Sequence, residues 1–188
     1  MTVMKTKATE PLTTESKIDF FFGRTILEDK ISPLSKALDE IENLKVSGSS
    51  TTQAYCMMLW ATIEMLSRFY SGQLGNQQAT KRLKNFLRDY FPHNREMTQV
   101  LLLFRNACMH SVVLHSFDPS GKKEVRFQIQ NDGQFLESAS RTKFSVNVNE
   151  FRMRLDRCIN KYRDDLEQNK LLQVKFEKVF LKMGYLAQ

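Results

Sequence analysis

The segment over residues 52–71 is the feature that most constrains how this chain folds. It reads TQAYCMMLWATIEMLSRFYS, and apolar side chains occupy nearly every side of the helix that it would form. Such a helix must be covered all round, so we expect it at the centre of a helical domain. Glu64 is its only acidic residue, and we expect this carboxylate either at the protein's edge or paired with a buried base.

Apolar residues recur at helical spacing over much of the remaining chain. Further helices are expected over residues 17–45, 77–91, 94–114 and 150–170. Pro33 is expected to restart the first of these helices, with Ser32 as its N-cap. Asn149 is expected to cap the last helix, and the tail after Lys170 either continues that helix or docks as a separate segment.

The period of the apolar residues changes from helical to alternating between about residues 123 and 148. Strands are expected over residues 124–130, 134–138 and 143–148, with a hairpin turn at Asn131–Gly133. The predicted fold is therefore mainly α, an up-and-down helical bundle with a small antiparallel β-hairpin or three-strand insertion. Residues 1–15 are expected to form a disordered polar leader, and residues 16–188 a single domain.

Composition narrows the classes of function. No apolar run approaches the roughly 18 residues that span a bilayer, and the N-terminus lacks an apolar signal region. We therefore expect a cytoplasmic protein without a membrane partner. The three cysteines, Cys56, Cys108 and Cys158, lack zinc-site spacing and are expected to be buried thiols. No metal or cofactor is expected, because the common phosphate-loop, dinucleotide and metal motifs are missing. The net charge of +7 permits nucleic-acid binding without demonstrating it.

A polar group interrupts the most apolar part of the chain, LLLFRNACMHSVVL at residues 101–114. On a helix, Asn106 and His110 share a face, and the long side chain of Arg105 reaches the same groove. Arg105 would grip a phosphate and His110 would exchange protons near neutral pH, which suits metal-free RNA cleavage. The alternative is structural, with Arg105 paired to Glu64 and His110 buried in the core.

The spacing R-N-x-x-x-H resembles the signature of the HEPN family, the higher eukaryotes and prokaryotes nucleotide-binding domains. The resemblance covers roughly residues 17–165, with its specific part at 105–110. It implies a helical bundle, a homodimer and a metal-independent endoribonuclease, with Arg105, Asn106 and His110 of two chains in one composite site. Toxin–antitoxin systems, phage defence and RNA processing are the roles it implies, with an antitoxin or regulatory protein as a further partner. Other members of the family are non-catalytic binding modules.

Several residues outside the motif are weaker candidates. Lys122, Lys123 and Arg126 follow the motif helix and are expected to hold the RNA backbone. On a continuing helix His115 would point away from His110, and His93 is expected at the surface in a turn after Pro92.

Overall fold

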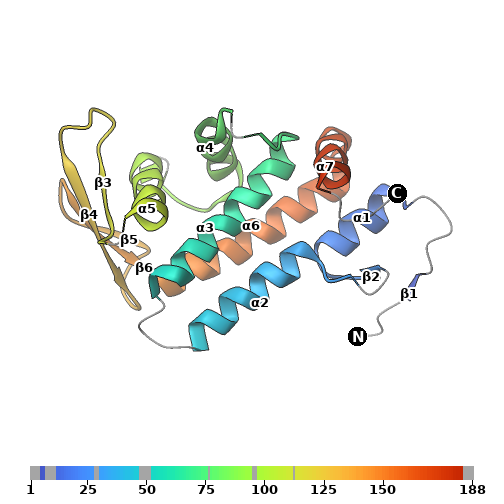
Figure 1. The fold of residues 1–188 in the computed structure, drawn as a ribbon, viewed down its shortest axis with the longest axis horizontal. Coiled ribbons are helices and arrows are strands. Elements are labelled where there is room, and N and C mark those ends of the chain that lie inside the picture. The colour runs from blue at the N-terminus through green and yellow to red at the C-terminus, as the bar shows by residue number, and fades with distance from the viewer. Residues whose placement is uncertain are drawn as a thin grey trace.

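The computed structural model describes residues 5–6, 12–27, 30–46, 52–75, 77–94, 97–111 and 113–183. Within these ranges the chain is mainly helical and carries a small four-stranded sheet between its fifth and sixth helices, as the sequence predicts in outline (Figure 1). The helices are α1 (Thr14–Phe21), α2 (Pro33–Val46), α3 (Thr52–Ser71), α4 (Ala79–Tyr90), α5 (Thr98–His110), α6 (Val148–Gln168) and α7 (Lys170–Lys182). The sheet strands are β3 (His115–Phe117), β4 (Glu124–Gln130), β5 (Leu136–Ser140) and β6 (Lys143–Asn147).

Helix α3 occupies the predicted residues 52–71 and lies at the centre of the molecule. It packs against α2, α4, α5, α6 and α7. Trp60 shows why this position suits the sequence, because its ring is fully buried against Phe104 of α5 and Phe151 of α6. Among the helices of the described ranges, none is long and apolar enough to cross a bilayer.

The helix predicted over residues 17–45 is divided into two. Helix α1 ends at Phe21, and Gly23 then takes the left-handed conformation, at φ 75°, that glycine adopts without strain. Helix α2 begins at Pro33, and the Ser32 hydroxyl accepts from the backbone N–H of Ser35, which confirms Ser32 as the N-cap. A short strand β2 (Ile26–Leu27) lies between the helices.

The leader predicted over residues 1–15 falls largely outside the described residues. Its described parts include β1 (Lys5–Thr6), which pairs in parallel with β2. They also include Thr13, whose hydroxyl accepts from the backbone N–H of Ser16 and caps α1.

The sheet is mixed and four-stranded, which corrects the predicted antiparallel hairpin and three strands. Its strand order is β3-β4-β6-β5, and the pair β4–β6 is parallel. The turn at Asn131–Gly133 therefore does not fold β5 back onto β4. The chain passes over one end of the sheet instead, and β6 then enters between β4 and β5. Two hairpins form instead: β3 with β4 through residues 118–123, and β5 with β6 through Arg141 and Thr142.

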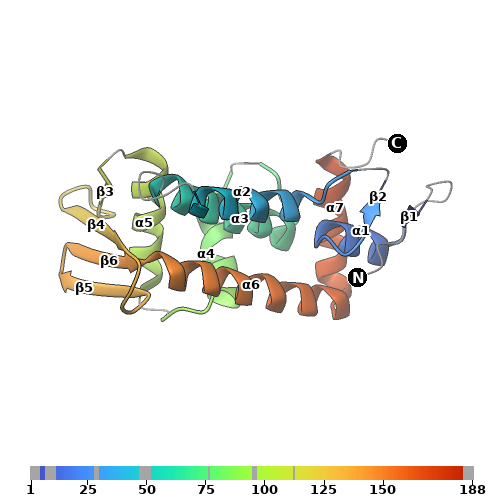
Figure 2. The ribbon, with the colours of Figure 1, turned by 90° about the horizontal axis from the view of Figure 1, so that it is seen from below.

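The two faces of the sheet differ in chemistry. Val125, Phe127 and Val146 are buried on the face toward α5, where the Phe127 ring lies 5.3 Å from that of Phe104. Arg126 and Lys143 are paired in the parallel register and point to the other, solvent-facing side. Figure 2 shows the sheet at one end of the molecule beside α5, with α7 and α1 at the opposite end.

Strand β6 runs directly into α6, and the residue that joins them is also the helix cap. The Asn147 side chain accepts from the backbone N–H groups of Asn149 and Glu150 and donates to Gly133 O. Asn147, and not the predicted Asn149, is therefore the N-cap of α6. In the described structure, the side chain of Asn149 makes one hydrogen bond, which it donates to the carbonyl of Asn131.

The tail after Lys170 forms a separate helix and does not continue α6. Asn169 caps α7 by accepting from the N–H groups of Leu171 and Leu172. Helix α7 packs on α3 and α1. Gly72, which ends α3 at φ 72°, allows this contact, because a Cβ there would lie 3.2 Å from the Cβ of Lys175.

Candidate functional site

Helix α5 separates its apolar residues from its polar ones. Leu101, Phe104, Ala107 and Cys108 are buried in the core. Arg105 is half-buried, and Asn106 and His110 are exposed. The polar interruption of the sequence is therefore the outer edge of a helix whose other sides are packed inside the chain.

The three motif side chains meet at one guanidinium nitrogen. Nη1 of Arg105 donates to Oδ1 of Asn106 at 3.0 Å, and it lies 3.3 Å from Nε2 of His110. A guanidinium can only donate, so a hydrogen bond between these two groups requires the His110 tautomer that accepts at Nε2.

Glu64 of α3 fixes the other edge of the Arg105 guanidinium. Its Oε1 accepts from Nε of Arg105 at 2.6 Å and lies 2.5 Å from Nη2. The pair is largely shielded, with side-chain exposures of 23% for Arg105 and 21% for Glu64. The ion pair named as the structural alternative therefore exists. The second half of that alternative is wrong, because His110 is exposed.

A small open pocket of about 70 Å³ lies beside this ion pair. Glu64 and Ser67 of α3, Thr80 and Arg82 of α4, and Arg105 and Asn106 of α5 line it with three apolar neighbours. Arg82 brings a second cation into the pocket wall. It is only 5% exposed, and its Nη1 donates to the carbonyl of Gly75 at 2.9 Å.

The environment of Arg82 was not foreseen from the sequence, where KRLKNFLR at 81–88 resembles a solvated basic face. Burial, and secondarily the nearby guanidinium of Arg68, lower the pKa of Arg82. The available signal was the helical position of Arg82 next to Leu83 and four residues before Phe86, because those two residues face the core.

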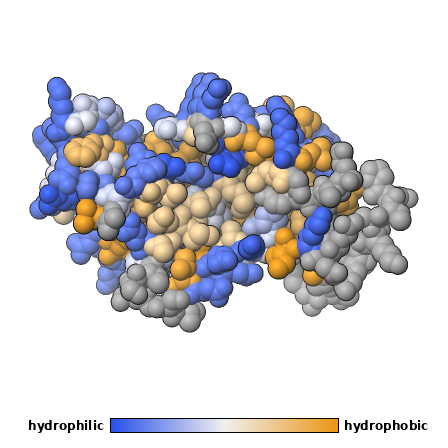
Figure 3. All heavy atoms as spheres, viewed as in Figure 1, coloured by the Kyte–Doolittle hydropathy of each residue, from blue (hydrophilic) through white to orange (hydrophobic). Residues whose placement is uncertain are grey.

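The leucines beside the motif do not form the walls of a cleft between chains. Leu101, Leu102 and Leu103 are buried within their own chain, so they are unavailable to a partner. A different apolar surface lies beside the site on α3, where Ala61 is exposed and Met57, Met58 and Met65 are half-buried. Figure 3 shows a pale orange area in the middle of the viewed face, where α3 lies in Figure 1.

Lys122 and Lys123 lie in the loop between β3 and β4, and Arg126 lies in β4; all three are exposed. The Arg126 guanidinium donates to Oε2 of Glu124 at 2.9 Å, so part of its charge is locally balanced. These three residues therefore belong to the sheet region, which packs next to α5, and not to the motif helix itself.

The other two histidines have structural contacts. His93 is half-buried and not simply at the surface, since Nδ1 lies 2.8 Å from Phe91 O and Nε2 lies 2.7 Å from the Thr98 hydroxyl. His115 is the first residue of β3, with Nδ1 3.2 Å from the Ser111 hydroxyl and 4.0 Å from Glu124. Both groups face the same nitrogen, so this trio lacks the relay geometry of a serine hydrolase.

The described part of the chain contains no group of three or more His, Cys, Asp or Glu residues that could hold a metal ion. Cys56, Cys108 and Cys158 are all buried free thiols, as expected. Contact with Cys56, followed by burial, raises the pKa of the Cys108 thiol. Comparison of the chain with protein-family models, curated proteins and solved structures found no match.

Proposed function

We propose that this protein is a metal-independent endoribonuclease that works as a homodimer, as the resemblance of its R-N-x-x-x-H motif to the HEPN family implies. The observation that carries the proposal is the convergence of Asn106 and His110 on Nη1 of Arg105. A toxin or phage-defence effector is the role that fits such an activity.

The chemistry needs few groups. Nε2 of His110 takes the proton from a ribose 2′-hydroxyl, and the 2′-oxygen attacks the adjacent phosphorus. The bond from phosphorus to the 5′-oxygen breaks, leaving a 2′,3′-cyclic phosphate and a 5′-hydroxyl. Arg105 stabilises the charge that gathers on the phosphoryl oxygens, and Asn106 keeps the guanidinium in place.

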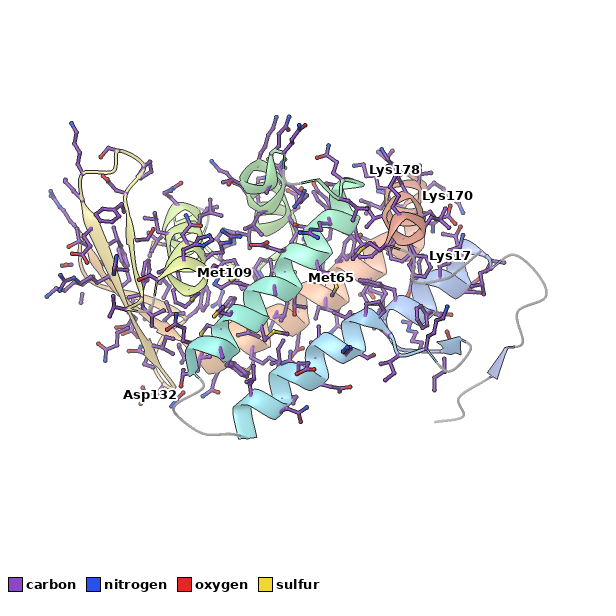
Figure 4. The ribbon with its side chains drawn as sticks, in the orientation of Figure 1. Lys17, Met65, Met109, Asp132, Lys170 and Lys178 are labelled. Carbon is purple, nitrogen blue, oxygen red and sulfur yellow. The ribbon has the colours of Figure 1, made fainter. Side chains whose placement is uncertain are left out.

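A dimer supplies what one chain lacks. The departing 5′-oxygen needs a proton, and each chain offers one motif histidine; in a composite site, His110 of the second chain provides it. The apolar surface on α3 supports such pairing, because Met57, Met58, Ala61 and Met65 lie on the helix that also carries Glu64. Figure 4 labels Met65 on α3 and Met109 on α5, the two helices that hold the Glu64–Arg105 pair.

A non-catalytic module of the same fold, binding a nucleotide, RNA or a protein, is the second candidate. The observation that favours it is the Glu64 carboxylate, which occupies Nε and Nη2 of Arg105 and balances its charge. A phosphate would have to compete with this carboxylate for the guanidinium.

The deciding experiment is cleavage of end-labelled single-stranded RNA by purified protein in EDTA. The wild type and the exposed-cation control Lys178→Ala should cut, and Arg105→Ala and His110→Ala should lose at least 100-fold in rate. Light scattering on the same samples should show dimers. A wild type that leaves RNA intact, or a His110→Ala variant that cuts normally, would refute the ribonuclease; a monomeric active enzyme would refute the composite site.

A further inference from the structure

The outward face of the sheet carries rings and cations side by side. The register pairs His115 with Arg126 across β3 and β4, and pairs Arg126 with Lys143 across β4 and β6. Directly paired residues point to the same side of a sheet, so these three side chains share the solvent face. Phe117 joins them, because it lies two residues after His115 on β3.

Phe117 is unusually open for a ring of its size. Its exposure is 54%, and its contact with the His115 ring is edge-on, with ring centres 6.0 Å apart. The two rings therefore do not stack face to face, and more than half of the Phe117 side chain stays open. By contrast, Phe127 and Phe144 stack on each other on the buried side of the same sheet.

The parallel pairing of β4 and β6 gathers positive charge at one end of this face. Because Lys143 is level with Arg126, the loop before β4 and the turn before β6 lie at the same end, and Arg126 N–H donates to Thr142 O. This end carries five exposed cations, which are Lys122, Lys123, Arg126, Arg141 and Lys143.

The two carboxylates at this end are engaged locally. Asp118 accepts from the backbone N–H groups of Lys122 and Lys123 and from the Ser120 hydroxyl. Glu124 accepts from Arg126. Within the described residues, Lys122, Arg141 and Lys143 form no ion pair. Five cations against two carboxylates leave this end with a positive excess that attracts phosphates.

We propose that the outward face of β3, β4 and β6 binds single-stranded RNA, with a base stacked on Phe117 and the backbone held by Lys122, Lys123, Arg141 and Lys143. An open aromatic on a sheet between cations is the arrangement by which proteins hold unpaired bases, since every base has a face that stacks. This inference rests on the proposed ribonuclease, whose substrate this face would hold; β3 begins five residues after His110, and the face itself is turned away from α5.

The test measures RNA binding apart from cleavage. Anisotropy of a fluorescein-labelled 12-nucleotide single-stranded RNA is recorded with the His110→Ala protein as the parent, at several salt concentrations. Phe117→Ala should weaken binding about 10-fold through the loss of one stacked base. Arg141→Ala and Lys143→Ala should each reduce the slope of log K against log salt by about 0.7.

Matched controls lie at the other end of the molecule on α7. Leu171→Ala removes an apolar side chain that is 64% exposed, and Lys178→Ala removes an exposed cation. Both should bind RNA as the parent does. All these positions are exposed, and unchanged thermal unfolding will show that each variant is folded.

The outcomes separate the platform from the ribonuclease. A parent that does not bind the RNA, or a Phe117→Ala variant that binds as tightly as its parent, overturns the platform even when the wild type cuts RNA. Conversely, binding that depends on Phe117 and Lys143 supports the platform even when the wild type fails to cut. Equal weakening by Lys178→Ala and Lys143→Ala would show only a general charge effect and would overturn the assigned face.

Discussion

Glu64 and Arg105 lie 41 residues apart in the chain, yet one carboxylate oxygen of Glu64 contacts both Nε and Nη2 of Arg105. This contact joins the central helix to the motif helix. It also leaves Nη1 as the nitrogen that faces Asn106 and His110. Glu64 is thus a positioning residue for the proposed site, since it acts through Arg105.

Replacing Glu64 tests this positioning role. Glu64→Ala leaves the guanidinium partly buried without its partner, and we expect the free energy of unfolding in urea to fall by about 1–3 kcal/mol. In the RNA assay kcat should fall more than KM rises, and Glu64→Gln, which still offers an acceptor oxygen, should recover part of kcat. As a control, Asp164→Ala breaks an ion pair with Arg163 whose carboxylate is 60% exposed and should cost less than about 1 kcal/mol. Equal kcat values for the two Glu64 variants would contradict the positioning role.

The N-cap of α6 gives a second prediction. Asn147→Ala removes two accepted bonds at the helix start and one donated bond to Gly133 O, and should lower the free energy of unfolding by about 2 kcal/mol. Asn149→Ala removes one exposed bond and should cost less than about 1 kcal/mol. Chemical denaturation of both variants measures the difference, and a larger loss for Asn149→Ala would restore the cap predicted from the sequence.

Phe151 lies where the helices and the sheet meet. Its ring is fully buried and contacts Trp60, Phe91, Phe104 and Phe135. Phe151→Ala should therefore destabilise the fold by about 3–5 kcal/mol, through the cavity that it leaves. Met153→Ala, two residues on and 44% exposed, should change the free energy by less than about 0.5 kcal/mol. Similar urea midpoints for the two variants would show that this junction is not a core.

Acid should weaken the contact between α1 and α7. Hydrogen bonds from Lys17 and Thr14 hold the pKa of Glu177 below its ordinary value of 4.5. A lowered folded-state pKa stabilises the fold above about pH 4.5, and this contribution disappears as the pH falls through the folded pKa. The free energy of unfolding of the wild type should thus exceed that of Glu177→Gln at pH 7, and the difference should vanish below pH 4.5. The difference between the wild type and Lys17→Met should depend on pH in the same way. A constant difference from pH 7 to pH 3 would contradict this account.

The central helix α3 and strand β4 were well predicted because their signals are local. The ranges 52–71 and 124–130 agree with α3 and β4 at both ends, since apolar periodicity lies within each segment and the glycines Gly72 and Gly133 follow them closely. Strand pairing was predicted wrongly because the turn signal at Asn131–Gly133 is also local. The parallel partner of β4 is set by distant contacts, among them the bond from Asn147 to Gly133 O, and these leave no periodic trace.

The site was predictable in its residues but only partly in its surroundings. The spacing of Arg105, Asn106 and His110 places them together, and Glu64 stood out as the one acid of an apolar helix. The sequence did not indicate that Arg82 of α4 lines the pocket, because the burial of Arg82 depends on how α4 packs against α3. The burial of Leu101, Leu102 and Leu103 in the core of their own chain likewise depends on how α5 packs against its neighbours.

The direct passage from β6 into α6 couples the sheet to the helical bundle through a single residue. Asn147 ends the last strand, begins the longest helix described and ties both to the loop at Gly133. A shortened chain that lacked the sheet would also lose the N-cap of α6. Deleting the inserted strands would therefore disturb the helical bundle as well.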